Sequence, residues 1–145
     1  MLIAGADALL ESPYYFPVLE VLHILGFALT VGTIALIDFR LLGWGLPEQT
    51  AAGLSTNLAP WTLVGIVSML LTGPMLFVVD PDMYYLNFSF QLKMVFLTAA
   101  ITFHYTAHRK TASASGSPLR TKAVACVSLA LWASVIFGGI FIAFV

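Results

Sequence analysis

The sequence predicts an all-α integral membrane protein: a four-helix transmembrane bundle with both termini on the outer side (N-out/C-out). Composition is the first reason. Of 145 residues, 60% are hydrophobic and only 9% are charged, whereas a soluble domain carries about 25% charged residues. The second reason is that four apolar stretches are each long enough to cross a bilayer, which requires about 20 residues. Because a backbone in lipid must satisfy its own hydrogen bonds, these stretches are expected to be helices.

The four predicted helices belong to a single transmembrane domain spanning residues 1–145, and they cover residues 17–37, 58–79, 88–107 and 123–145. Three segments containing turn-forming residues separate them: "GWGLPEQTAAGLSTN", "DPDMYYLN" and "HRKTASASGSPLRTK". Glycine, proline and serine favour loops at such positions. We expect the second segment to be a short acidic turn and the third to be a mobile loop.

Basic residues set the expected orientation. Arg40 follows the first predicted helix, and four more basic residues lie between the third and the fourth: Arg109, Lys110, Arg120 and Lys122. Cytoplasmic loops carry the excess of lysine and arginine, so both loops are expected to be cytoplasmic. Acidic residues then fall on the outer side: Asp7, Glu11, Asp80 and Asp82. The expected location is the bacterial inner membrane, with several passes.

Charge and cysteine content exclude several classes of protein. The formal net charge of −1 creates no strong positive field, so nucleic acid is not an expected partner. The only cysteine, Cys126, rules out an internal disulfide and a thiolate metal cluster. Membrane lipid is the expected surrounding partner.

Three titratable side chains lie on one face of the third predicted helix. His104 follows Lys93 by eleven residues, which at about 100° per residue returns to nearly the same direction, about 16 Å further along the helix axis. His108 follows one turn later on nearly the same face. Ionisable residues inside a membrane are costly and mark functional sites. Each residue also has a purely structural explanation. Lys93 could snorkel to the interface, His104 could form a hydrogen bond with a neighbouring helix, and His108 could lie at the interface.

The first predicted helix carries polar residues at two matching levels. His23 lies about 9 Å and Lys93 about 7–8 Å from the starts of their helices. If the polar faces of the two helices meet, His23 therefore opposes Lys93. His104 and His108 then lie nearer the level of Asp38 and Arg40. Purely structural explanations also exist. His23 could form a hydrogen bond with Glu20 one turn back, and Asp38 and Arg40 could form a local ion pair or serve only as a signal of membrane orientation.

These residues offer ligands of the kinds that several cofactors use. "EVLH" at Glu20–His23 has the Glu-x-x-His spacing of di-iron bundles, but a second such pair is missing from the sequence. His23 with Met69 or Met75 and Met94 offers copper ligands, although no recurrent copper motif supports this. Haem needs one or two axial ligands across an apolar, aromatic pocket. His23 and a neutral Lys93 meet that requirement by depth.

Two stretches resemble the HemJ family, bacterial four-helix membrane proteins linked to protoporphyrinogen IX oxidation, and the wider group that includes CopD-like copper-resistance proteins. They are "LHILGFALTVGTIALIDFRLLG" and "LKMVFLTAAITFHYTAH". The matching residues are His23, Gly26, Gly32 and Arg40 in the first, and Lys93 and His104 in the second. The resemblance implies haem b, with His23 and Lys93 as its ligands. After Arg40 the chain departs from the family pattern, reading "RLLGWGLPE".

The leading functional hypothesis is therefore a b-type haem-binding protein in electron transfer or redox chemistry. In this hypothesis His104 and Arg40 are second-site candidates: a further ligand, a propionate anchor, or part of a proton or electron route. A haem-dependent oxidoreductase, resembling HemJ and passing electrons from a porphyrinogen to quinone, is one alternative. A copper-handling or structural membrane subunit is the other. Quinone or a redox protein are candidate partners, and the glycine-rich helices also leave room for a homo-oligomer.

Overall fold

The computed structural model describes residues 12–114 and 116–144, and every regular element in those ranges is helical. The elements are α2 (Tyr15–Leu42), α3 (Ala51–Val79), α4 (Pro81–Tyr85), α5 (Phe88–Phe103), the π-helical η1 (His104–His108), α6 (Arg109–Ser113), α7 (Pro118–Phe141) and the 3-10 helix η2 (Ile142–Phe144). The predicted all-α class is confirmed for these residues. Asp7 and Glu11, which entered the orientation argument, lie outside the described residues.

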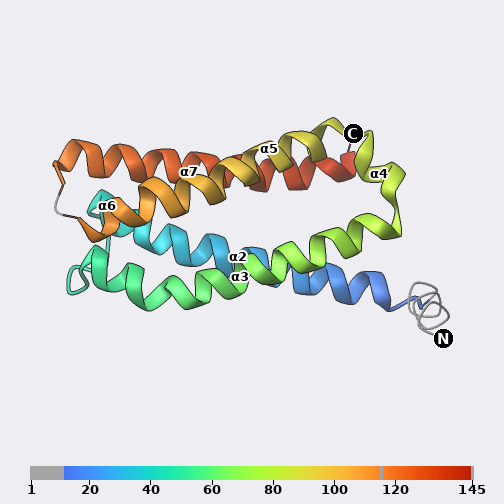
Figure 1. The fold of residues 1–145 in the computed structure, drawn as a ribbon, viewed down its shortest axis with the longest axis horizontal. Coiled ribbons are helices and arrows are strands. Elements are labelled where there is room, and N and C mark those ends of the chain that lie inside the picture. Colours follow the sequence, from blue (N-terminus) through green and yellow to red (C-terminus); the bar gives the residue numbers. More distant parts are fainter. Residues whose placement is uncertain (1–11, 115, 145) are drawn as a thin grey trace.

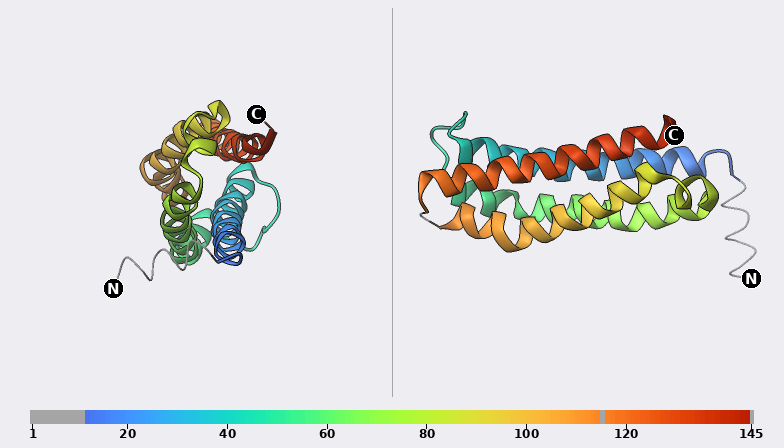
Figure 2. Two further views of the ribbon diagram at one scale, coloured as in Figure 1. Left: turned by 90° about the vertical axis from the view of Figure 1, so that its right-hand side faces the viewer. Right: turned by 90° about the horizontal axis from the view of Figure 1, so that it is seen from above.

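The long helices run side by side along one axis (Figure 1). α2 packs mainly on α3, and α5 packs mainly on α7, while α2 also touches α7. The views along and across the long axis show these two helix pairs next to each other (Figure 2). α4 links α3 to α5 at one end of the molecule, where the C-terminus also lies, and α6 lies at the opposite end. These are called the α4 end and the α6 end below.

Among the described residues, three helical segments are long and apolar enough to cross a membrane: Tyr15–Leu42, Ala51–Val79 and Pro118–Phe144. In the most apolar 18-residue stretch of each segment, only 28%, 33% and 22%, respectively, is buried inside the protein. Their large hydrophobic side chains therefore cover the outside of the molecule, a surface that fits lipid rather than water. The third predicted helix corresponds to three shorter elements, α5, η1 and α6, which follow one another without a loop.

Two helices, α3 and α7, start earlier than the sequence predicted, and a side chain caps each of them. The Thr50 side chain accepts a hydrogen bond from Gly53 N, so "AAGLSTN" is helical and not part of the loop. In the same way, Asp80 accepts from Met83 N, and the expected acidic turn contains α4. The third connecting segment was predicted to be a loop; instead its first part is α6, and α7 begins at Pro118 after the capping Ser117.

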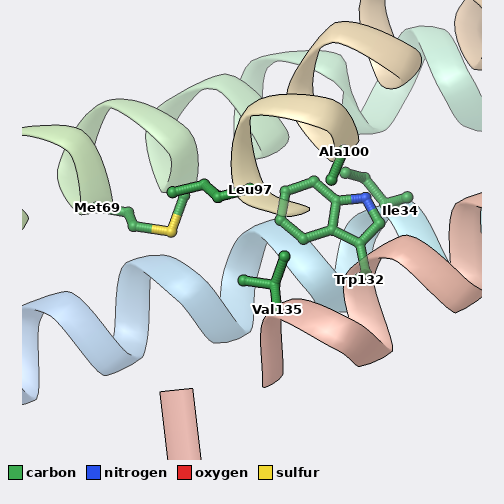
Figure 3. Packing of buried hydrophobic residues seen from close by; sticks show 6 residues of the cluster. All are labelled: Ile34, Met69, Leu97, Ala100, Trp132 and Val135. Atoms are coloured by element: carbon green, nitrogen blue, oxygen red, sulfur yellow. The ribbon is translucent and has the colours of Figure 1, made fainter. Parts of the chain in front are cut away.

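A hydrophobic layer lies midway along the molecule, where α2, α3, α5 and α7 meet. Its buried side chains are Ile34, Met69, Leu97, Ala100, Trp132 and Val135 (Figure 3). Trp132 is only 3% exposed, and its ring also packs against Phe27 with 6.4 Å between centroids. A second, smaller cluster of buried apolar residues lies nearer the α6 end: Ile37, Leu41, Ala112 and Ala125. The central layer separates two polar regions, one toward each end.

Glycine allows α2 and α3 to approach closely. A methyl group on Gly65 would lie 2.5 Å from Thr30 Oγ1 and 2.7 Å from the Gly26 carbonyl oxygen. Small residues at helix contacts let backbones approach in this way in membrane proteins. Gly32, also on α2, has nothing within 4 Å of such a methyl group.

Candidate functional site

A cavity of about 480 Å³ opens between the helices at the α4 end. Residues of α2, α3, α4, α5, α7 and η2 line it, and most of them are apolar or aromatic. The aromatic side chains are Phe16, Phe27, Phe77, Tyr84 and Phe90, and the ionisable ones besides Tyr84 are Glu20, His23 and Lys93. His23 and Lys93 were predicted to oppose each other, and the structure brings them to the same cavity from α2 and α5.

The orientation of the His23 ring is fixed by α3. His23 Nδ1 lies 2.9 Å from Thr72 Oγ1. The Thr72 hydroxyl already donates its proton to the Ser68 carbonyl oxygen at 2.7 Å, so it accepts from His23. The proton therefore sits on Nδ1. The hydrogen-bond partner of His23 Nδ1 is therefore Thr72, and not Glu20 as the structural alternative had it.

With the proton on Nδ1, the opposite nitrogen, Nε2, carries the lone pair of the His23 ring. A histidine that binds a metal or haem iron through one nitrogen nearly always donates from the other to a fixed acceptor, and Thr72 supplies that acceptor here. Gly73 lies beside the ring: a methyl group on it would be 3.4 Å from His23 Cε1. The absence of a side chain there keeps the cavity open next to His23.

Lys93 reaches the cavity across the surface of α7. A methyl group on Gly138 would lie 3.0 Å from Lys93 Cβ, and one on Gly139 would lie 3.5 Å from Lys93 Nζ. The two glycines thus make the trough in which the Lys93 stem lies. Lys93 lines the cavity, and its amine lies beside Gly139.

Two oxygen-bearing side chains complete the polar lining. Glu20 lies one turn before His23 on α2, and Tyr84 belongs to the short helix α4. Partial burial, with a further contribution from the nearby Glu20 and Asp80 carboxylates, raises the pKa of the Tyr84 phenol. The phenol is therefore a neutral hydrogen-bond donor at physiological pH.

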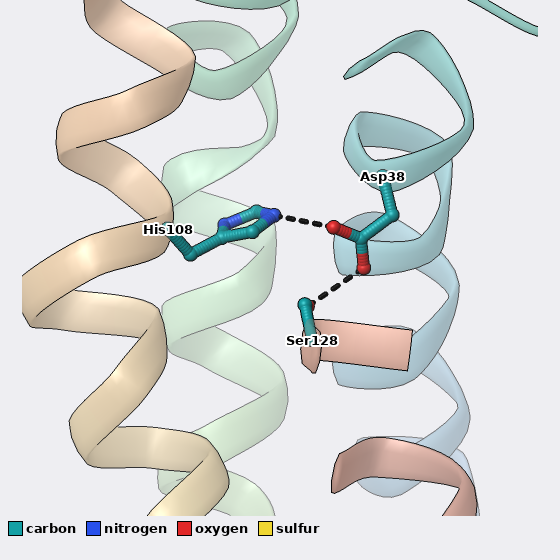
Figure 4. A network of polar contacts seen from close by, with 3 residues as sticks. All are labelled: Asp38, His108 and Ser128. Atoms are coloured by element: carbon teal, nitrogen blue, oxygen red, sulfur yellow. Dashed lines mark hydrogen bonds and ion pairs between the residues drawn. The ribbon is translucent and has the colours of Figure 1, made fainter. Parts of the chain in front are cut away.

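A second polar region lies toward the α6 end (Figure 4). His108 Nε2 donates to Asp38 Oδ1 at 2.7 Å, and Ser128 Oγ donates to Asp38 Oδ2 at 2.7 Å. The side chains of Asp38 and His108 are fully buried. The His108 side chain therefore faces the interior of the protein, and the partner of Asp38 is His108 rather than Arg40.

His104 lies beside this network and not in the cavity. It is 3% exposed, and the centroid of its ring is 5.1 Å from that of His108. We call Asp38, His104, His108 and Ser128 the inner cluster. Its position follows the prediction that His104 and His108 lie near the level of Asp38.

Arg40, a second-site candidate from the sequence, has a local structural role. Its Nε donates to the Gln49 carbonyl oxygen, which ties the end of α2 to the loop before α3. Arg40 does not contribute to the lining of the cavity. Nothing in this contact favours a propionate anchor.

Sequence reasoning missed Thr72 and Ser128, the two hydroxyl groups that hold His23 and Asp38. Both are buried within apolar stretches, where small hydroxyl side chains are common in membrane helices, so no sequence signal distinguished them. Within residues 12–114 and 116–144, no group of three or more His, Cys, Asp and Glu side chains is arranged to hold a metal ion. A cofactor that needs only one or two protein ligands is compatible with this donor set.

These features define a class: an all-helical protein with three membrane-length helices, an aromatic cavity lined by His23 and Lys93, and a separate buried acid–histidine cluster. The profile of the family of unknown function DUF6644 matches residues 13–145. The chain therefore belongs to this family. No curated protein and no solved structure matches it.

Proposed function

We propose that this chain is a b-type haem-binding protein of the bacterial inner membrane that transfers electrons. The proposal includes four membrane passes, with α5, η1 and α6 together forming the third. It places the α4 end outside, because Asp80 and Asp82 lie there, and the α6 end inside, because Arg109 and Lys110 lie there. This orientation follows the rule that basic residues stay on the cytoplasmic side.

The observation that carries the proposal is that His23 and Lys93 line one cavity from two different helices. Its volume of about 480 Å³ is within the range of roughly 300–1,000 Å³ typical of cofactor sites. Haem iron requires only one or two axial ligands in an apolar, aromatic pocket, and this lining fits that requirement.

Each residue has a defined task in this proposal. His23 would hold the iron through Nε2, while Thr72 holds Nδ1 and fixes the ring orientation. Lys93, in its neutral form, would be the second ligand. Phe27 and Phe77 offer apolar faces to a flat ring. Haem itself supplies one-electron exchange, and quinone or a redox protein is the proposed partner.

The first experiment is an absorption spectrum of the purified protein, oxidised and dithionite-reduced, with a pyridine haemochrome assay. We expect a Soret band and reduced α and β bands typical of haem b. A flat visible spectrum in protein produced with ample haem supply would overturn the proposal.

The ligands are then tested separately. His23→Gly should lose the native spectrum, and added imidazole should restore it by entering the space that the side chain vacates. Lys93→Met should change the ligand-field signature, whereas Lys110→Met, an exposed change on α6, should not. A native spectrum in His23→Gly without imidazole would remove His23 as a ligand.

A further inference from the structure

The inner cluster is a buried polar region that the proposed haem site does not use. Its four side chains come from α2, η1 and α7, and each is at most 3% exposed: Asp38, His104, His108 and Ser128. None of them lines the α4-end cavity. Ionisable groups in the interior of a membrane protein are costly, and by default they mark a functional site.

Two nitrogen atoms of the inner cluster lack a hydrogen-bond partner among the described residues: Nδ1 of His104 and Nδ1 of His108. Roughly 90% or more of buried polar groups in proteins are paired with protein atoms or with ordered water. Two neighbouring exceptions in one cluster point to a molecule that is not part of the chain. His108 already uses its other nitrogen to hold Asp38.

A hollow beside His104 has room for such a molecule. Its volume is about 10 Å³, close to the roughly 10–15 Å³ that one internal water needs. Its lining is largely polar, as such a water requires, and comprises Ile37, Ser55, Ala59, Thr62, His104, Tyr105 and Arg109. A metal ion is a poorer fit, because the described residues offer no set of three metal-binding side chains.

The backbone that carries both histidines is itself unusual. Residues His104–His108 form a π-helical turn between two α-helical segments, and such turns are rare and frequently lie at functional sites. The turn begins with one histidine and ends with the other, and it leaves both rings buried and 5.1 Å apart.

We propose that the inner cluster binds an internal water molecule beside His104, in this hollow, and one exchangeable proton that His104 shares with the hydrogen-bonded pair His108 and Asp38. The water takes up a proton from the aqueous side and gives one to the bare Nδ1 of His104, so an O–H bond breaks as an N–H bond forms and the water is left neutral. The carboxylate of Asp38 stabilises the resulting charge through His108, whose ring lies 5.1 Å from that of His104. The step moves a proton without a change of oxidation state, so no oxidant or reductant takes part. The groups facing the cluster are Tyr105 and Arg109 beside the hollow, hydroxyls of Ser55 and Thr62 on α3, and the hydroxyl of Ser128 on α7.

The test uses the full chain in lipid bilayers, labelled with ¹⁵N-histidine and measured by solid-state NMR. The chain has only three histidines, so His23→Gln leaves the signals of the inner cluster alone. We expect rapid magnetisation transfer from water to the imidazole nitrogens of His104, which lines the hollow. We also expect one imidazole to gain a proton as the pH falls through roughly 8 to 5, the range in which histidine titrates. Neither result requires haem, so failure here and failure of the haem proposal are distinguishable.

A plug variant locates the water. Ala59→Leu should fill the hollow and reduce the water transfer to His104 severalfold, whereas Ala99→Leu, on the exposed face of α5, should leave it unchanged. Absence of water transfer to His104 in the unsubstituted protein would overturn the water site. Unchanged transfer to His104 in folded Ala59→Leu would also overturn it. Imidazole signals that stay constant from about pH 4 to 9 would overturn the shared proton.

Discussion

His108 Nε2 and Asp38 Oδ1 lie 2.7 Å apart although 70 residues separate them along the chain, and neither side chain is exposed. The contact joins the π-helical turn η1 to the end of α2. Ser128 adds a link to α7 through the other carboxylate oxygen. One carboxylate therefore ties together three parts of the chain at the α6 end.

Asp38→Ala should destabilise the protein more than His108→Ala does. Removing the carboxylate leaves two buried donors, on His108 and Ser128, without an acceptor, each at a cost of roughly 1–3 kcal/mol. Removing the imidazole leaves Asp38 with its hydrogen bond from Ser128. Unfolding in detergent measures both changes. The double variant should lose less stability than the sum of the single losses, because the residues share one network. Additive losses would contradict a direct coupling, and Asp82→Asn, an exposed change, serves as the control.

Gly65→Ala should destabilise the contact between α2 and α3. The added methyl group would lie 2.5 Å from Thr30 Oγ1, so the two helices must separate. Gly32→Ala is the matched control, because its methyl group meets nothing within 4 Å and alanine favours a helix by about 1 kcal/mol. Melting temperatures should fall for the first variant and hold or rise for the second. Equal melting temperatures would contradict the close approach.

Trp132→Ala should leave a void in the central hydrophobic layer. In a water-soluble core such a change costs roughly 3–5 kcal/mol. We expect a smaller loss here, because helices in lipid associate through packing rather than the hydrophobic effect. Trp61→Ala, which removes a side chain that is 57% exposed, should have little effect. A comparable loss in both variants, measured as free energy of unfolding, would argue against a distinct packed layer.

Thr72→Val should weaken haem binding while preserving the shape of α3. The change removes the acceptor for His23 Nδ1, and loss of such a supporting contact typically costs about 10–100-fold in metal affinity. Thr98→Val is the control, since the Thr98 hydroxyl is exposed and donates only to the Met94 carbonyl oxygen of its own helix. Haem titration of the two apoproteins makes the comparison. Equal affinities would show that Thr72 does not orient an iron ligand.

The sequence located the polar residues along each helix but did not reveal how they pair. Spacing along α5 and η1 placed Lys93 at the level of His23, and both line one cavity. It placed His104 and His108 near the level of Asp38, where the inner cluster lies. It could not reveal that His108 is fully buried, because a histidine next to "RK" looks the same whether it faces water or the interior. The helix ends were also underestimated, since capping by Thr50 and Ser117 extends α3 and α7 into polar sequence.

Composition and apolar length by themselves determined that the chain is helical and suited to a membrane, because every backbone group in lipid must be paired within its own segment. The tertiary structure alone decided which side chains meet. Thr72 orients His23, Gly138 and Gly139 cradle Lys93, and Ser128 joins Asp38 and His108. Helical periodicity fixes the level and face of a residue on its own helix. Its hydrogen-bond partners depend on which helix packs opposite, and close packing between distant segments sets that choice.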